Sequence, residues 1–75
     1  MINEEIQELL SELEQDVERL RTLIYRIKAD LSQKNYKNIN IKVGVDTSSF
    51  LAQKIDANLF YLRSLIEKGA ELSQS

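Results

Sequence analysis

The chain has 75 residues, enough for a single small domain over residues 1–75, and its formal net charge at pH 7 is −2. It contains no cysteine and no histidine, which excludes disulfides, thiolate metal sites and histidine-based proton transfer. There is no signal-peptide pattern and no run of roughly 20 apolar residues, so we expect a cytoplasmic protein without a membrane partner. A chain this short forms only a small core by itself, and we therefore expect self-association.

The first helix is predicted to run from Asn3 to about Leu31 or Gln33. Asn3 is a good N-cap, and Glu4 and Glu5 follow it where the helix dipole favours negative charge. Two apolar rows repeat every seven residues: Ile6, Leu13, Leu20, Ile27 and Leu10, Val17, Ile24, Leu31. Such rows are typical of a helix that packs on a partner helix, and flanking leucines favour a bundle of four or more helices. The predicted oligomer interface comprises Ile6, Leu9, Leu10, Leu13, Val17, Leu20, Ile24 and Ile27.

Residues 38–46 show a different pattern, because apolar and other residues alternate strictly. The apolar positions are Ile39, Ile41, Val43 and Val45. This alternation predicts an extended, β-like connection with one buried face. The segment would pair with the same strand of another subunit or lie as a strap across the helices, and the pattern does not choose between them.

A second helix is predicted to begin among residues 46–49 and to end near Gly69. Its expected apolar face is Leu51, Ile55, Leu59, Leu62 and Ile66. The fold class is therefore mainly α: a helical hairpin with an extended connection, assembled as an oligomeric helix bundle. A second helix of that length would end beside Leu13 and leave Ile6, Leu9 and Leu10 for another subunit to cover.

Charge is distributed unevenly along the chain. Residues 1–18 hold seven acidic side chains and no basic one, whereas residues 19–42 hold seven basic side chains and one acidic. One interpretation is an anion-binding patch for a nucleotide or nucleic acid, formed by Arg19, Arg21, Tyr25, Arg26, Lys28 and Tyr36. The other interpretations are contact between the acidic part of one helix and the basic part of another, or plain solvation.

The second helix carries aromatic residues beside or opposite its expected apolar face. The predicted partner-binding surface comprises Phe50, Phe60, Tyr61 and Leu65. Alternatively, Phe50 packs beneath the connection.

The sequence offers no conventional catalytic constellation. Thr47, Ser48 and Ser49 have no histidine or cysteine to assist them, Gly44 stands outside any phosphate-binding loop, and the glutamates lack the histidines of di-metal bundles. We therefore expect a non-enzymatic oligomeric regulator, inhibitor or adaptor that binds another protein and needs no metal or cofactor. The alternatives are an oligomer that sequesters a nucleotide or other anionic ligand between subunits, and nucleic-acid binding through residues 19–42.

Overall fold

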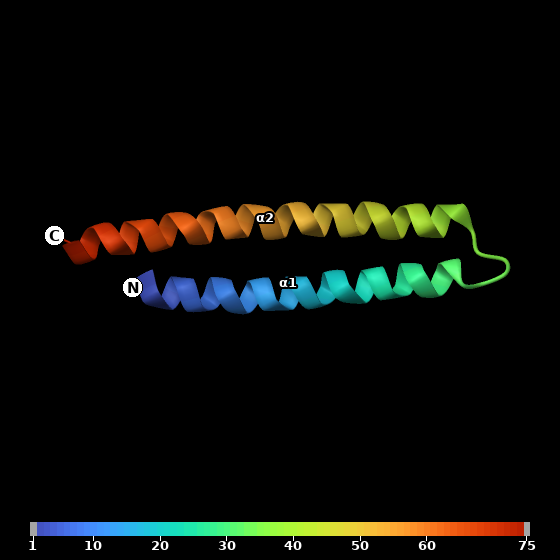
Figure 1. Ribbon diagram of the computed structural model, residues 1–75, viewed down its shortest axis with the longest axis horizontal. Helices are drawn as coiled ribbons and strands as arrows, with labels where there is room; N and C mark the ends of the chain where they lie inside the picture. The colour runs from blue at the N-terminus through green and yellow to red at the C-terminus, as the bar shows by residue number, and fades with distance from the viewer. Residues whose placement is uncertain (1, 75) are drawn as a thin grey trace.

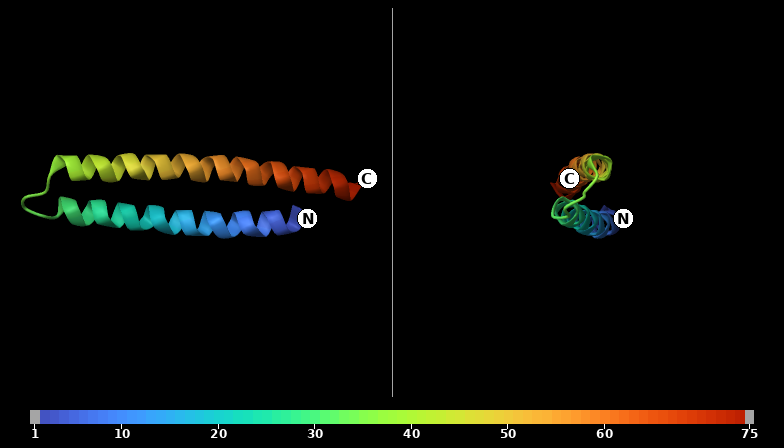
Figure 2. Two further views of the ribbon diagram at one scale, coloured as in Figure 1. Left: turned by 180° about the vertical axis from the view of Figure 1, so that it is seen from behind. Right: turned by 90° about the vertical axis from the view of Figure 1, so that its right-hand side faces the viewer.

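Two long helices make up the protein. The computed structural model describes residues 2–74, with side chains for residues 3–69. Helix α1 (Ile2–Leu31) and helix α2 (Asn38–Gln74) run antiparallel and are joined by residues 32–37 (Figure 1). The rod measures 62 × 15 × 13 Å, and the end-on view shows the two helices side by side (Figure 2). The predicted mainly-α hairpin is confirmed, and residues 2–74 contain no strand.

Local hydrogen bonds fix the turn between the helices. At the end of α1, the Ser32 hydroxyl donates to the Lys28 carbonyl at 3.0 Å, and the Gln33 N–H donates to the Asp30 carbonyl at 3.1 Å. At the start of α2, the Asn40 and Ile41 N–H groups donate to the Lys37 carbonyl at 3.0 and 3.3 Å. These bonds satisfy backbone groups that helix ends leave without partners, so a short connection suffices.

The helices meet along a seam, by which we mean the buried and half-buried residues spaced alternately three and four apart on each helix. On α1 the seam is Ile6, Leu9, Leu13, Asp16, Leu20, Leu23 and Ile27; on α2 it is Ile41, Gly44, Ser48, Leu51, Ile55, Asn58, Leu62, Leu65 and Gly69. This spacing is that of coiled-coil packing. Its best-buried apolar cluster is Leu9, Leu13 and Leu65, so the core lies toward the open end of the hairpin.

The predicted extended connection over residues 38–46 is wrong, because these residues form the start of α2. Of its four apolar side chains, only Ile41 lies in the seam; Ile39, Val43 and Val45 are 62%, 56% and 50% exposed. The predicted shared buried face is therefore wrong too. A lone strand has no partner for its backbone groups, whereas a helix satisfies them internally and places Ile41 against α1.

Because α2 begins earlier than predicted, the hairpin is also longer than predicted. Helix α2 begins at Asn38, continues past Gly69 and extends along the whole of α1. Leu9 is only 8% exposed and packs in the same cluster as Leu65, with Ile6 against it. The expectation that Ile6 and Leu9 lack a partner within the chain is wrong, whereas Leu10 remains 39% exposed.

The seam uses one expected row of α1, Ile6, Leu13, Leu20 and Ile27, but not the other. On α1, the row Leu9, Asp16, Leu23 faces α2, and the uninterrupted row Leu10, Val17, Ile24, Leu31 is half-exposed beside it. On α2, Asn58 and Leu65 lie in the seam, whereas Leu59 and Ile66, expected there, are 49% and 53% exposed. Each helix thus keeps a second apolar row outside the hairpin.

Gly44 allows a close approach of the helices. A Cβ atom at this position would lie 2.8 Å from Cγ1 and 3.3 Å from Cδ1 of Ile27. Alanine favours a helix over glycine by about 1 kcal/mol, but here the contact opposes that gain. We expect Gly44→Ala to be more stabilising, by about 1 kcal/mol, in an Ile27→Ala background than in the natural chain. Urea unfolding of the four proteins at one concentration measures this, and equal effects in both backgrounds would show that the contact imposes no constraint.

Candidate functional site

The polar side of the hairpin is one of two surfaces that flank the seam. It carries Glu5, Glu12, Arg19 and Arg26 from α1, and Thr47, Lys54, Tyr61 and Lys68 from α2. Two contacts join its rows: Lys54 Nζ lies 3.4 Å from a Glu12 carboxylate oxygen, and the Tyr61 hydroxyl donates to Glu5 Oε2 at 3.3 Å. One ion pair and one hydrogen bond, both exposed, therefore bridge the helices on this side.

The apolar side lies opposite. Residues three or four positions apart are neighbours on a helix, so each residue of the apolar side lies next to one row of seam residues. The polar side lies next to the other row, and the apolar rows of the two helices therefore lie together on the opposite side. The apolar side comprises Leu10, Val17, Ile24 and Leu31 from α1, and Val45, Ala52, Leu59 and Ile66 from α2. All eight are exposed, the larger ones by 39–53%. An apolar strip that runs along both helices has the composition of an interface.

Asp16 is a charged side chain within the seam and is fully buried. Arg19 Nη1 donates to its Oδ1 at 3.1 Å, and Lys54 Nζ lies 3.1 Å from its Oδ2. The Lys54 contact is an ion pair rather than a well-aligned hydrogen bond, because Oδ2 accepts none within the described residues. A buried carboxylate is costly unless paired, so these two cations make its position tolerable.

Lys54 connects Asp16 to the polar side. Its ammonium group contacts the carboxylates of Asp16 and Glu12. Both contacts raise the pKa of Lys54 above its ordinary value of 10.5, and the contact with Asp16 has the larger effect. Lys54 is therefore positively charged throughout the neutral range.

A groove opens on the polar side, in the half nearer the turn. It has a volume of about 650 Å³, and its lining is Gln15, Glu18, Arg19, Thr22, Leu23 and Arg26 from α1 with Thr47, Phe50 and Leu51 from α2. Leu23 and Leu51 come from the seam, and Phe50 is 73% exposed. The groove thus combines an apolar floor with two arginines.

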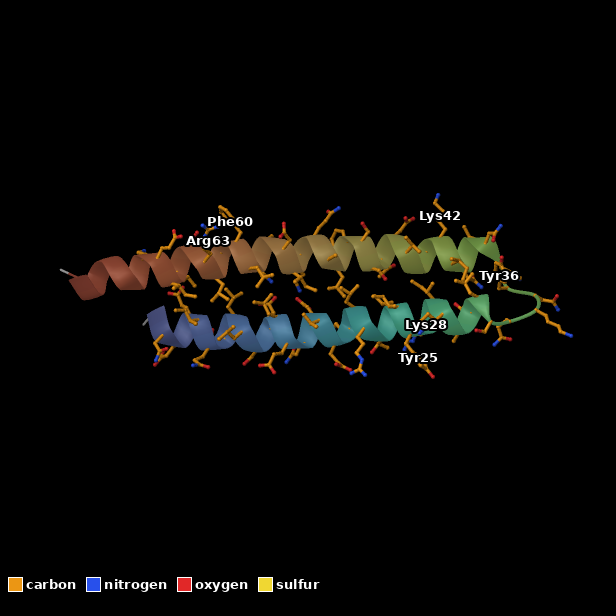
Figure 3. All side chains as sticks on the ribbon, viewed as in Figure 1. Tyr25, Lys28, Tyr36, Lys42, Phe60 and Arg63 are labelled. Atoms are coloured by element: carbon orange, nitrogen blue, oxygen red, sulfur yellow. The ribbon has the colours of Figure 1, made fainter. Side chains whose placement is uncertain are left out.

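The six predicted anion-binding residues do not gather at one place. Arg19 and Arg26 line the groove, whereas Arg21 pairs with Glu18 at 3.9 Å. Tyr25 points away from α2, and Tyr36 lies in the turn (Figure 3). Lys28 lies one helical turn before the end of α1 and does not line the groove.

The predicted partner-binding residues also separate. Leu65 belongs to the buried cluster, and Tyr61 contacts Glu5. Phe50 and Phe60 are similarly exposed, at 73% and 72%, but Phe50 lines the groove while Phe60 points outward from α2 (Figure 3). The two phenylalanines therefore belong to different surfaces.

Sequence reasoning missed the buried polar residues of the seam. Asp16 stands seven residues after Leu9 and seven before Leu23, and that spacing was the available signal. Asn58 is the other case: its Nδ2 is buried and makes no hydrogen bond within the described residues. In residues 3–69 no group of acidic side chains could hold a metal ion. No helix in the described part of the chain is long and apolar enough to cross a membrane.

The fold and its surfaces define a small antiparallel helical-hairpin protein. Residues 1–64 match the family described as Sulfolobus spindle-shape virus 1, protein D-63, and the chain belongs to that family. No curated protein matches the sequence, and no solved structure matches it.

Replacing Asp16 tests what its burial contributes. Asp16→Leu would complete the apolar row between Leu9 and Leu23 and would leave no buried charge, because the Arg19 and Lys54 side chains are 64% and 43% exposed. The change therefore resembles the replacement of a whole buried ion pair by apolar residues, which stabilises by up to about 4 kcal/mol. We expect the free energy of unfolding, measured with urea at pH 7, to rise. Lys54→Met should lower it when Asp16 is present and have little effect beside Leu at position 16. Equal effects of Lys54→Met in both backgrounds would mean that the ion pair contributes nothing.

The stability contributed by Lys54 should depend on pH at the alkaline end. Because the folded pKa lies above the unfolded value, this contribution is complete below pH 10.5 and is lost as the pH rises through the folded pKa. The stability difference between the natural chain and Lys54→Met should therefore be constant from pH 7 to 9 and shrink only as the pH rises beyond 10.5. A difference that shrinks on acidification from pH 9 to 7 would contradict the assignment.

Proposed function

We propose that the protein is a non-enzymatic adaptor or regulator that associates with itself through its apolar side and binds another protein. The observation that carries this proposal is the apolar side, which leaves eight apolar residues exposed along both helices. Within the described side chains, only Leu9, Leu13 and Leu65 are buried apolar residues. A hairpin with so small a core gains most from a second copy.

Two hairpins facing each other by their apolar sides would form a four-helix bundle. The strip from Leu10 to Leu31 is about 30 Å long at 1.5 Å per residue. A standard interface takes about 800 Å² from each partner, which is roughly an eighth of the hairpin's 6264 Å² surface. The same patch on both copies gives a closed, symmetric dimer.

Binding of another protein is supported by the aromatic residues that such a dimer would leave outside. Phe50 lies on the polar side of the seam and Phe60 on the outer face of α2. Exposed phenylalanines are enriched at protein interfaces, and the proposed dimer would cover neither. An inhibitor would use the same surfaces, and a cytoplasmic location stays a prediction.

The anionic-ligand hypothesis has narrower support. Arg19 and Arg26 share the groove, but the other four predicted residues lie elsewhere. Two arginines can hold one phosphate or carboxylate, so only a site at the groove would remain.

Self-association tests the first part of the proposal. At micromolar concentration we expect light scattering to give at least twice the monomer mass of 8.7 kDa. Val17→Glu should shift the protein toward monomer, because Val17 is 52% exposed in the hairpin but would bury its new charge in a dimer. Tyr25→Glu, at a 73% exposed position on the outer face of the same helix, is the control and should leave the mass unchanged. A monomeric natural chain would refute the proposal.

Recovery of the tagged protein from its native host tests the second part. We expect a protein to be captured in proportion to the tagged chain, and Phe50→Ser or Phe60→Ser to lose it while the mass stays dimeric. Capture of a nucleotide or nucleic acid instead, lost in Arg26→Gln, would favour the alternative.

A further inference from the structure

The groove on the polar side is the surface that the proposed dimer leaves open. Its residues adjoin the seam opposite the apolar side, so covering the apolar side does not fill it. A dimer would therefore carry two such grooves, each available to a partner.

The floor and one edge of the groove are apolar. Leu23 and Leu51 form the floor from the seam, and neither is fully buried. Phe50 stands at the edge with 73% of its surface exposed. A partner that covers this ring and both leucines removes apolar surface from water, which favours an apolar or amphipathic occupant.

The rim of the groove carries two arginines, Arg19 and Arg26, and one glutamate, Glu18. Arg26 makes no ion pair within residues 3–69. Arg19 contacts Asp16, yet its side chain remains 64% exposed. Glu18 also lines the groove, but Arg21 lies 3.9 Å from its carboxylate. Carboxylates of a partner would complement these two arginines, since guanidinium groups bind carboxylates in bidentate geometry.

The length of the groove fits a helix. Its α1 lining runs from Gln15 to Arg26, which corresponds to about 17 Å or three helical turns. Two packed helices present a groove into which a third helix can lay its apolar face, with anchors at positions i, i+3 or i+4, and i+7. We propose that this groove binds an acidic amphipathic helix of a partner protein. The inference rests on the proposed protein-binding function and specifies its partner.

Two synthetic peptides of about 15 residues test this proposal. They share leucine at positions i, i+4, i+7 and i+11 and alanine at several others; the remaining positions are glutamate in one and lysine in the other. Fluorescence anisotropy at low salt should show the glutamate peptide binding the full chain at least tenfold more tightly than the lysine peptide. Added salt should narrow the difference.

Variants locate the binding site. Phe50→Ser should weaken binding of the glutamate peptide at least tenfold. Phe60→Ser is the matched control, because the Phe60 ring is as exposed as that of Phe50 but lies outside the groove. The affinity of this variant for the glutamate peptide should be unchanged. Arg26→Gln should reduce the preference for glutamate over lysine. Circular dichroism and light scattering on the same samples confirm that each variant keeps its helices and its mass.

Several results would overturn the inference. They are equal binding of both peptides, no binding of the glutamate peptide, or loss of binding on Phe60→Ser instead of Phe50→Ser. Binding of a single-stranded oligonucleotide, dependent on Arg26 and Phe50, in place of the acidic peptide would assign the groove to nucleic acid. If a host protein is captured equally by the natural chain and Phe50→Ser, the groove proposal fails while the adaptor proposal stands.

Discussion

The ion pair between Asp16 and Lys54 is the interaction on which the alignment of the two helices depends. Most other layers of the seam are apolar and would tolerate a slide of seven residues. Such a slide would bring Thr47 or Tyr61 beside Asp16 and leave a fully buried carboxylate without its lysine. It would also part Ile27 from Gly44, where the helices approach closely. A single buried charge can thus specify a register while reducing stability, as polar residues do in coiled-coil seams.

The same alignment makes the two flanks of the hairpin different. On the polar side, contacts within the chain join the helices in the half farther from the turn. Lys54 pairs there with Glu12, and the Tyr61 hydroxyl donates to Glu5. Toward the turn, Arg19 and Arg26 face Thr47 and Phe50, and the groove remains. The opposite side has apolar residues on both helices and no charge between them. Two unlike surfaces on opposite sides can be occupied at once, which is what an adaptor requires: one surface for self-association and one for a target.

The sequence predicted the first helix, the acidic residues near its start and the mainly-α hairpin, because a long, strongly periodic segment has few alternatives. The predicted N-cap was wrong, because α1 begins at Ile2 and Asn3 lies within it. The sequence could not predict which apolar row of that helix faces α2. The rows beginning at Leu9 and Leu10 both adjoin Ile6 and Leu13, and the interrupted row is the one that lies inside, where Lys54 contacts Asp16. The extended connection predicted for residues 38–46 was wrong for a related reason. Their alternation suits a strand, yet Ile41 and Gly44 also fit the helical seam, and packing against α1 outweighs local β propensity. Arg19, Arg26 and Phe50 were identified from the sequence as candidate site residues. Their position around one groove could not be predicted, because it depends on how the two helices are aligned.

If the apolar side joins two copies of the chain, as proposed, a residue of that side becomes covered in the dimer, whereas its neighbour on the outer face of the same helix stays exposed. Because the chain contains no cysteine, a single introduced thiol reports on its own position. The most direct measurement is the alkylation rate of Leu59→Cys compared with Phe60→Cys, from high to low protein concentration. We expect the thiol at position 59 to react slowly at high protein concentration and faster on dilution, while the thiol at position 60 reacts rapidly at every concentration. Equal rates at both positions, independent of concentration, would contradict the proposed dimer.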